Sequence, residues 1–121
     1  MLTQEQIVRL QDIGISACHA GAAYEARIIF DGLLKVRPDN AVALIGKALS
    51  HIVVDEFPAA EEILRTQVLA KHPDDPEATA MLGLCFVLSE RSDEARVLLG
   101  EIATQENTSG QLARDLLAQL G

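Results

Sequence analysis

Cys18 and His19 are the first neighbours in this sequence whose side chains could do covalent chemistry, because a thiol beside an imidazole is the pairing of a cysteine nucleophile with its base. Adjacent residues on a helix point roughly 100° apart and do not face each other. No third group in the surrounding sequence would orient the base. We therefore do not expect this pair to act as a nucleophile.

The remaining candidates for chemistry are equally sparse. Among His19, His51 and His72, only His51 has a possible second ligand at helical spacing, the carboxylate of Asp55, and we expect a surface hydrogen bond there rather than a metal site. The two cysteines form no CxxC motif and are expected to be reduced thiols, and there is no glycine-rich phosphate loop or GxSxG elbow. The sequence predicts no catalytic, cofactor-binding or metal-binding residues and no enzyme.

The charge balance also excludes classes of partner. Eighteen acidic side chains against ten basic ones give a net charge of −8, which opposes phosphate backbones, so nucleic acid is not an expected partner. No apolar run approaches the ~18 residues of a membrane helix, and the first residues, MLTQEQIVRL, lack the form of a signal peptide. We expect no membrane insertion and a cytoplasmic location.

A helical repeat organises the chain. Alanines recur at spacings of 34 and 35 residues, each followed four residues later by a larger apolar residue. A period of this length is typical of a helical hairpin. The alanines are Ala26, Ala60 and Ala95, the larger residues are Phe30, Leu64 and Leu99, and the first two units close with Pro38 and Pro73.

The residues around these alanines resemble the tetratricopeptide repeat (TPR), in which Leu-Gly, an aromatic, Ala, a Phe-like residue and Pro recur at fixed spacing. The first unit matches at Leu10, Ile13, Gly14, Ala17, Ala26, Phe30, Leu33 and Pro38, and the third at Leu82, Gly83, Phe86, Ala95, Leu99 and Ile102. The middle unit fits at Leu44, Ala48, Ala60 and Leu64, but Lys47, His51 and Gln67 fall at apolar positions and its tail has one extra residue. We expect this unit to be the least stable.

The resemblance implies an all-α fold in a single domain, residues 1–121. Three TPR-like hairpins, at about 7–40, 41–75 and 76–106, would stack as a right-handed superhelix, with a terminal helix at about 109–120 capping the open end. Helix starts are predicted at Thr3 with Gln6, at Asn40 and at Asp75 with Pro76, and a left-handed turn at Gly21.

The first helix of each TPR hairpin lines a concave groove, and the resemblance implies fifteen groove residues, twelve of them apolar. They are Val8, Gln11, Ile15, Cys18, His19, Val42, Ile45, Leu49, Ile52, Val53, Glu77, Ala80, Leu84, Val87 and Leu88. If each apolar residue exposed ~40 Å², the groove would present ~500 Å² of apolar surface, the upper end of what monomers leave uncovered. We expect something to cover it.

The apolar groove could be covered in three ways. The superhelix could close on itself or take in the leucine face of Leu112, Leu116, Leu117 and Leu120; two copies could pair as a homodimer; or a foreign amphipathic helix could lie in the groove with apolar anchors at i, i+3, i+4 and i+7. A peptide C-terminus is not expected, because the positions that clamp a carboxylate in some TPR proteins hold Gln11, Ile15, Gly46, Glu77 and Met81.

Size, repeat number and an apolar groove together resemble the small TPR chaperones of bacterial type III secretion systems. That resemblance implies a cytoplasmic protein-binding module that shields an apolar helical segment of an export substrate, and a second small helical protein as a co-chaperone. The alternative is a constitutive TPR scaffold or adaptor subunit that stays in a multiprotein assembly.

Overall fold

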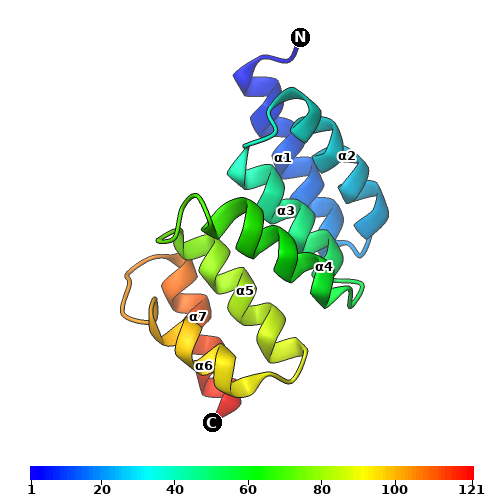
Figure 1. Ribbon diagram of the computed structural model, residues 1–121. Coiled ribbons are helices and arrows are strands. Elements are labelled where there is room, and N and C mark those ends of the chain that lie inside the picture. The colour runs from blue at the N-terminus through cyan, green and yellow to red at the C-terminus, as the bar shows by residue number, and fades with distance from the viewer. The chain divides into compact units, whose positions relative to one another are not determined.

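Helices make up the fold, as predicted. The computed structural model describes residues 1–121 and contains helices without strands (Figure 1). The elements are α1 (Gln4–His19), α2 (Ala23–Val36), α3 (Ala41–Ile52), α4 (Phe57–Glu62), the π-helical segment η1 (Ile63–Leu69), α5 (Pro76–Leu88), α6 (Ser92–Gly100) and α7 (Thr108–Leu120). They form two compact units, Met1–Ile63 and Leu64–Gly121. The predicted single domain and superhelical twist stay predictions.

Side-chain caps begin the helices where the sequence predicts. The Thr3 hydroxyl accepts from the Gln6 amide at 3.1 Å, and the Thr3 amide donates to Oε1 of Gln6 at 2.9 Å, which completes a capping box. Asn40 and Asp75 accept from backbone amides in the first turns of α3 and α5, at 3.2 and 3.0 Å. Asn107 does the same for α7 at 2.7 Å. Each cap satisfies a backbone donor that the helix itself cannot pair.

One turn geometry recurs at the end of α1, α3 and α5. Gly21, Asp55 and Glu90 have φ values of 82°, 62° and 63°, and they are spaced 34 and 35 residues apart. The amide after each of them donates to a carbonyl five residues earlier, at 2.8 to 2.9 Å, as in a Schellman motif. The prediction at Gly21 is confirmed, and the same turn closes all three first helices, although only one of them has glycine.

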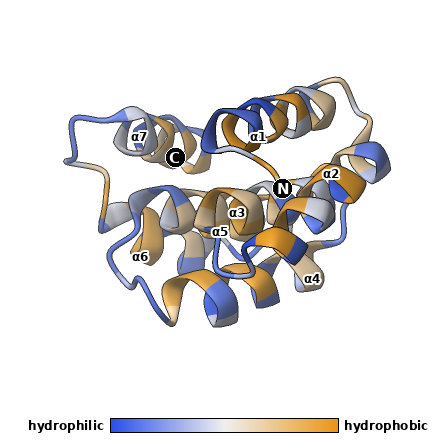
Figure 2. Cartoon of the chain, turned by 90° about the horizontal axis from the view of Figure 1, so that it is seen from above, coloured by the Kyte–Doolittle hydropathy of each residue, from blue (hydrophilic) through white to orange (hydrophobic).

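In the first unit, α2 packs against both α1 and α3 (Figure 1). Phe30 is fully buried on α2, and its ring occupies the space next to two glycines: a Cβ on Gly14 of α1 would lie 2.7 Å from the ring, and one on Gly46 of α3 would overlap it. α1, α2 and α3 each have an apolar and a polar side, as the colours of α1 show in Figure 2. Phe30 therefore joins three helices in one core.

The second unit repeats the arrangement with different residues. Leu99 on α6 is fully buried, and its side chain fills the space beside Gly83 on α5. The terminal helix α7 packs against both α5 and α6, as α3 packs against α1 and α2. Within this unit α7 thus occupies the place of the next hairpin's first helix, which is the position of a cap.

The extra residue of the middle unit lies in the π-helical segment. The Ala70 amide donates to the Arg65 carbonyl five residues earlier at 3.0 Å, the bond of a π-helix. The wider turn brings Val68, fully buried, to the place expected for Gln67, which is exposed. The buried pair Leu64 and Val68 is therefore four residues apart, whereas Phe30 and Leu33 are three apart. The apolar position missing from the predicted register is present one residue later.

Candidate functional site

The side chains of Cys18 and His19, the pair considered for covalent chemistry, do not interact. Cys18 is buried, His19 is exposed, and no hydrogen bond joins them. Burial raises the pKa of the Cys18 thiol, and the nearby Arg27 guanidinium offsets this only in part, so the reactive thiolate is disfavoured. No group of three or more His, Cys, Asp or Glu side chains could hold a metal ion.

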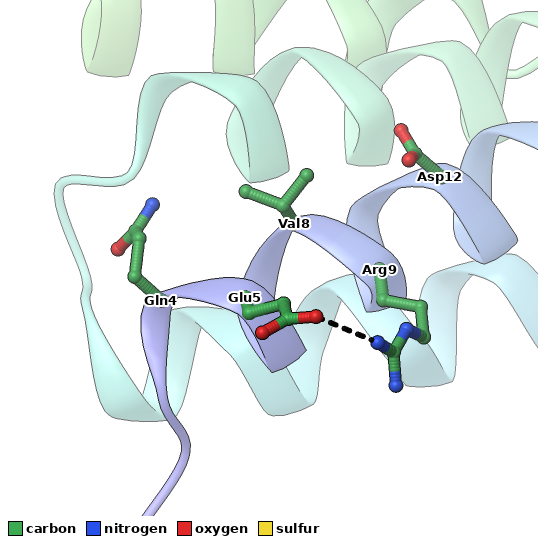
Figure 3. Close-up of a pocket in the computed structure, with 5 residues that line it drawn as sticks. All are labelled: Gln4, Glu5, Val8, Arg9 and Asp12. Atoms are coloured by element: carbon green, nitrogen blue, oxygen red, sulfur yellow. Dashed lines mark hydrogen bonds and ion pairs between the residues drawn. The ribbon is translucent and has the colours of Figure 1, made fainter.

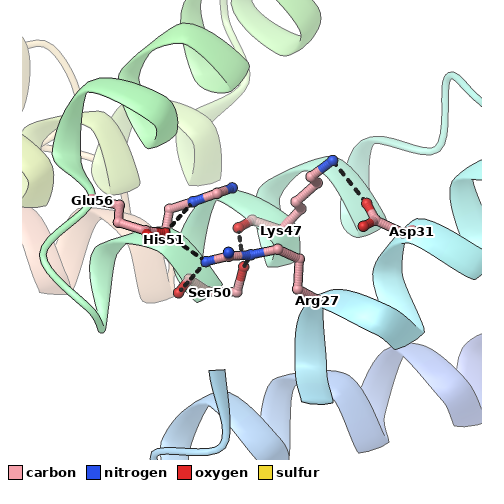
Figure 4. A network of polar contacts seen from close by, with 6 residues as sticks. All are labelled: Arg27, Asp31, Lys47, Ser50, His51 and Glu56. Carbon is pink, nitrogen blue, oxygen red and sulfur yellow. Dashed lines mark hydrogen bonds and ion pairs between the residues drawn. The ribbon is translucent and has the colours of Figure 1, made fainter. Parts of the chain in front are cut away.

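His51 pairs with Glu56, so the predicted hydrogen bond between His51 and Asp55 was wrong. Nδ1 of His51 lies 2.7 Å from Oε1 of Glu56, and Nη2 of Arg27 lies 2.8 Å from the same oxygen (Figure 4). These two hydrogen bonds, with the His51 bond the larger influence, hold the pKa of Glu56 below its ordinary range. Asp55 instead forms the left-handed turn between α3 and α4.

Arg27 also ties α2 to the end of α3. Its Nε donates to the buried Ser50 hydroxyl at 3.1 Å, and Nη2 donates to the Ser50 carbonyl at 3.2 Å. One turn earlier on α3, Lys47 pairs with Asp31 of α2 at 2.8 Å (Figure 4). Lys47 and His51, which interrupt the apolar pattern, therefore have polar partners. This network supports the hairpins and offers no free group for catalysis.

The fifteen predicted groove residues divide by exposure. Five are buried, four are partly buried and six are exposed. The buried ones are Gln11, Cys18, Ile45, Ile52 and Ala80; the partly buried ones are Ile15, Leu49, Leu84 and Val87; the exposed ones are Val8, His19, Val42, Val53, Glu77 and Leu88. The five buried side chains are not free to contact a partner in this fold, and less apolar surface is exposed than twelve open side chains would give. For the others, partner binding stays a prediction.

Two buried or packed members have roles within the first unit. Gln11 on α1 donates from Nε2 to Oδ1 of Asn40 at 3.3 Å, and the same oxygen caps α3. Leu49 is partly buried and packs against the core cluster that includes Phe30. The packing signature could not separate these residues from open groove positions, because their neighbours come from loops and from the preceding hairpin.

The open part of the first unit lies on α1 and α3. A hollow of about 400 Å³ surrounds Val8, lined by Gln4, Glu5, Val8, Arg9 and Asp12. Figure 3 shows Val8 and Asp12 on the same side of α1, while Glu5 and Arg9 form an ion pair at 3.1 Å along its edge. A second hollow of about 350 Å³ shares Gln4 and is lined by Gln4, Ile7, Gln11, Arg37, Asp39, Asn40 and Val42. We call the surface formed by Gln4, Val8, Asp12 and Val42 the α1–α3 surface.

The second unit has a cavity of its own. It has a volume of about 370 Å³ and is lined by Glu77, Ala80, Met81, Thr108, Ser109 and Leu112, from the first turns of α5 and the first turns of α7. Glu77 is exposed as a whole, but partial desolvation of its carboxyl, and then the neighbouring Asp75 charge, raise the pKa of that carboxyl. The groove prediction identified Glu77 and Ala80, but not the residues of α7 that complete this cavity.

The comparison with protein families decides the class. A family model described as tetratricopeptide repeat matches residues 56–120, which is more than half of the chain. The chain belongs to the tetratricopeptide repeat family. No curated protein matches it. The matched residues contain α4, the π-helical segment, α5, α6 and α7. The unmatched N-terminal part repeats the same left-handed turn and the same glycine-to-apolar packing.

Family membership makes this TPR chain a protein-binding module. TPR domains are typically non-catalytic, and they imply protein partners in general. None of the helices is both long and apolar enough to span a bilayer. The functional site is therefore expected to be a surface that binds another protein.

Proposed function

We propose that this TPR module binds an amphipathic helix of a protein partner on its α1–α3 surface. The observation that carries the proposal is the solvent exposure of Val8 on α1, 43%, and of Val42 on α3, 40%. These two helices are the first helices of consecutive hairpins, and they contact each other. Both valines adjoin hollows that no side chain of the unit fills. An amphipathic helix buries such residues with anchors at i, i+3, i+4 and i+7.

The partner that fits this proposal best is a subunit whose apolar segment must be covered until it assembles. The small TPR chaperones of type III secretion, which this chain resembles in size, repeat number and apolar groove residues, do this for export substrates in the cytoplasm. A second small helical co-chaperone would belong to the same complex. A scaffold subunit would use the same surface but would keep its partner.

Purification from the native host tests the proposal. Tagged wild-type chain, Val42→Glu and Val97→Glu are purified in parallel, and their partners are identified by mass spectrometry. Val97 is 72% exposed on α6, which is the second helix of its hairpin and does not line the predicted groove, so its variant controls for the added charge. We expect Val97→Glu to keep the wild-type partner and Val42→Glu to lose it, because a charge in a desolvated apolar contact costs several kcal/mol and ~1.4 kcal/mol is tenfold in affinity.

The same experiment separates the two kinds of partner. A chaperone releases its partner when the partner is exported, so the exported form should be found without this chain. A scaffold remains bound in fixed stoichiometry. If Val42→Glu and Val97→Glu retain the same partner equally well, the α1–α3 surface is not the binding site.

A further inference from the structure

The cavity between α5 and α7 places a carboxylate among apolar and hydroxyl side chains. Glu77 lines it beside Ala80, Met81 and Leu112, and the hydroxyl residues Thr108 and Ser109 line the α7 side. The Glu77 carboxylate takes part in no ion pair or hydrogen bond. A carboxylate that has no partner within the chain and lies beside apolar groups attracts a cation.

From this geometry we infer that the cavity receives a lysine or arginine side chain of the bound protein. The proposal rests on the proposed function, since it names a feature of the partner that the module binds. A lysine or arginine has a long apolar stem and a cationic head, and such side chains bury the stem against apolar groups while the head keeps polar contacts. Ala80, Met81 and Leu112 suit the stem, and Glu77 with the two hydroxyls suits the head.

An anion does not fit the same cavity, although two helices begin beside it. The caps at Asp75 and Asn107 already use the amides of Ala78 and Gly110, at 3.0 and 2.7 Å, and Pro76 has no amide hydrogen to donate. Glu77 adds a negative charge where an anion would lie. The negative charge of Glu77 therefore opposes the attraction that the two helix N-termini would exert on an anion in this cavity.

The balance of charge in the chain favours a basic partner as well. Of the ten basic residues, Arg9, Arg27, Lys47, Arg91 and Arg96 are held in ion pairs within the chain. Arg114 donates to the carbonyls of Ala103 and Gln105 at 2.6 and 3.1 Å. The net charge of −8 is thus left largely to free carboxylates, which attract a basic segment and repel an acidic one.

The α7 wall of the cavity is held in place by the loop before it. Gly110 is buried, and a Cβ there would lie 3.1 Å from the Ile102 carbonyl oxygen and would overlap the Gln105 carbonyl. The absence of a side chain lets α7 begin close against this loop. Arg114 bonds the loop from the next turn of α7. The cavity is consequently formed before any partner arrives, which lowers the cost of binding.

Small organic cations test the inference without knowledge of the partner. The full chain, labelled with ¹⁵N, is titrated with n-butylammonium and n-butylguanidinium, and with 1-butanol and butyrate as neutral and anionic probes of similar size. We expect saturable shifts of the amide signals of Glu77, Met81, Ser109 and Leu112 with the two cations. Glu77→Gln should weaken this binding at least tenfold, whereas Glu101→Gln, which removes an exposed carboxylate in the turn after α6, should leave it unchanged.

Three results would overturn the inference: equal binding of 1-butanol, tighter binding of butyrate, or no effect of Glu77→Gln. Spectra of each variant without probe show whether it is folded, and Ser109→Ala, which keeps the charge but removes one hydroxyl, provides a second test with an expected weakening of a few fold. Failure here leaves the proposed function standing if Val42→Glu still loses the partner. If the cations bind but Val42→Glu keeps its partner, the proposed function fails alone.

Discussion

The ring of Phe30 occupies the space that a side chain on Gly46 would need. Phe30 is on α2 and Gly46 on α3, so the absence of a Cβ lets two consecutive hairpins approach at this ring. Gly14 on α1 allows the same approach from within the hairpin. The core of the first unit depends on this one aromatic side chain and two glycines on the neighbouring helices.

Gly46→Ala should destabilise the protein despite the better helix propensity of alanine. Overpacking costs about 1 to 3 kcal/mol, and the propensity gain is ~1 kcal/mol, so we expect a net loss of up to about 2 kcal/mol in urea unfolding. Gly32→Ala is the matched control, since nothing lies within 4 Å of a Cβ at that position of α2. It should be neutral or stabilising. A stabilised Gly46→Ala would contradict the packing described for Phe30.

Glu90→Gly should stabilise the second unit. Glu90 holds a φ of 63°, a conformation that costs a residue with a Cβ about 1 kcal/mol more than glycine. We expect the free energy of unfolding to rise by ~0.5 to 1 kcal/mol, measured by urea denaturation. Glu25→Gly, in the exposed face of α2, should lower it by a similar amount. If both variants were destabilised alike, the left-handed turn at Glu90 would be disproved.

Glu56 should make stability depend on pH. The His51 and Arg27 hydrogen bonds lower the pKa of Glu56 in the folded protein, so the folded state binds its proton less readily than the unfolded chain. Its contribution is complete above the ordinary glutamate pKa of ~4.3 and is lost as the pH falls through the lowered value. Glu56→Gln should therefore be less stable than wild type at pH 7, and the difference should shrink at pH 3. A difference that is equal at both pH values would contradict this.

Deletion of Gln67 should be tolerated, because it removes the extra residue of the π-helical turn. Val68 would then lie three residues after Leu64, as Leu33 follows Phe30, and an α-helix could bury it. We expect a cooperative thermal transition close to that of wild type. Deletion of Thr79, buried within α5, should abolish it, since every following apolar residue of α5 would rotate by roughly 100°. Equal unfolding of both variants would show that the π-helical turn is essential.

The architecture was predictable from local spacing. The alanines recur at a 34- to 35-residue period, and Gly14 and Gly83 each lie 16 residues before their large partners, Phe30 and Leu99. These spacings, and the caps at Thr3, Asn40 and Asp75, all act within one hairpin or one helix turn. The register of η1 was not predictable, because one extra residue can be absorbed at any of several places. Asp55 and Glu90 carried no turn signal, since neither is glycine.

The candidate sites were predictable only in part. Val8 and Val42 followed from the repeat frame, but the burial of Gln11 depends on a bond to Asn40, 29 residues away. The cavity beside Glu77 needs residues of α7, about 30 positions later, and only their packing on α5 brings them together. Leu49 illustrates the same limit: it matches the groove pattern, yet it packs on the core, so a charge there would test folding rather than binding.

Binding at the α1–α3 surface is tested most directly by the affinity of the captured partner for purified Val42→Glu and for Ile28→Glu. The affinity is measured by isothermal titration calorimetry, together with the thermal unfolding of each variant. Ile28 is 73% exposed on α2, the second helix of the first hairpin, and provides the matched apolar-to-charged change away from the α1–α3 surface. Both variants should unfold at temperatures close to that of the wild type, while Val42→Glu should lose at least a hundredfold in affinity and Ile28→Glu none. Unchanged affinity in Val42→Glu, or an equal loss in Ile28→Glu, would contradict binding at this surface.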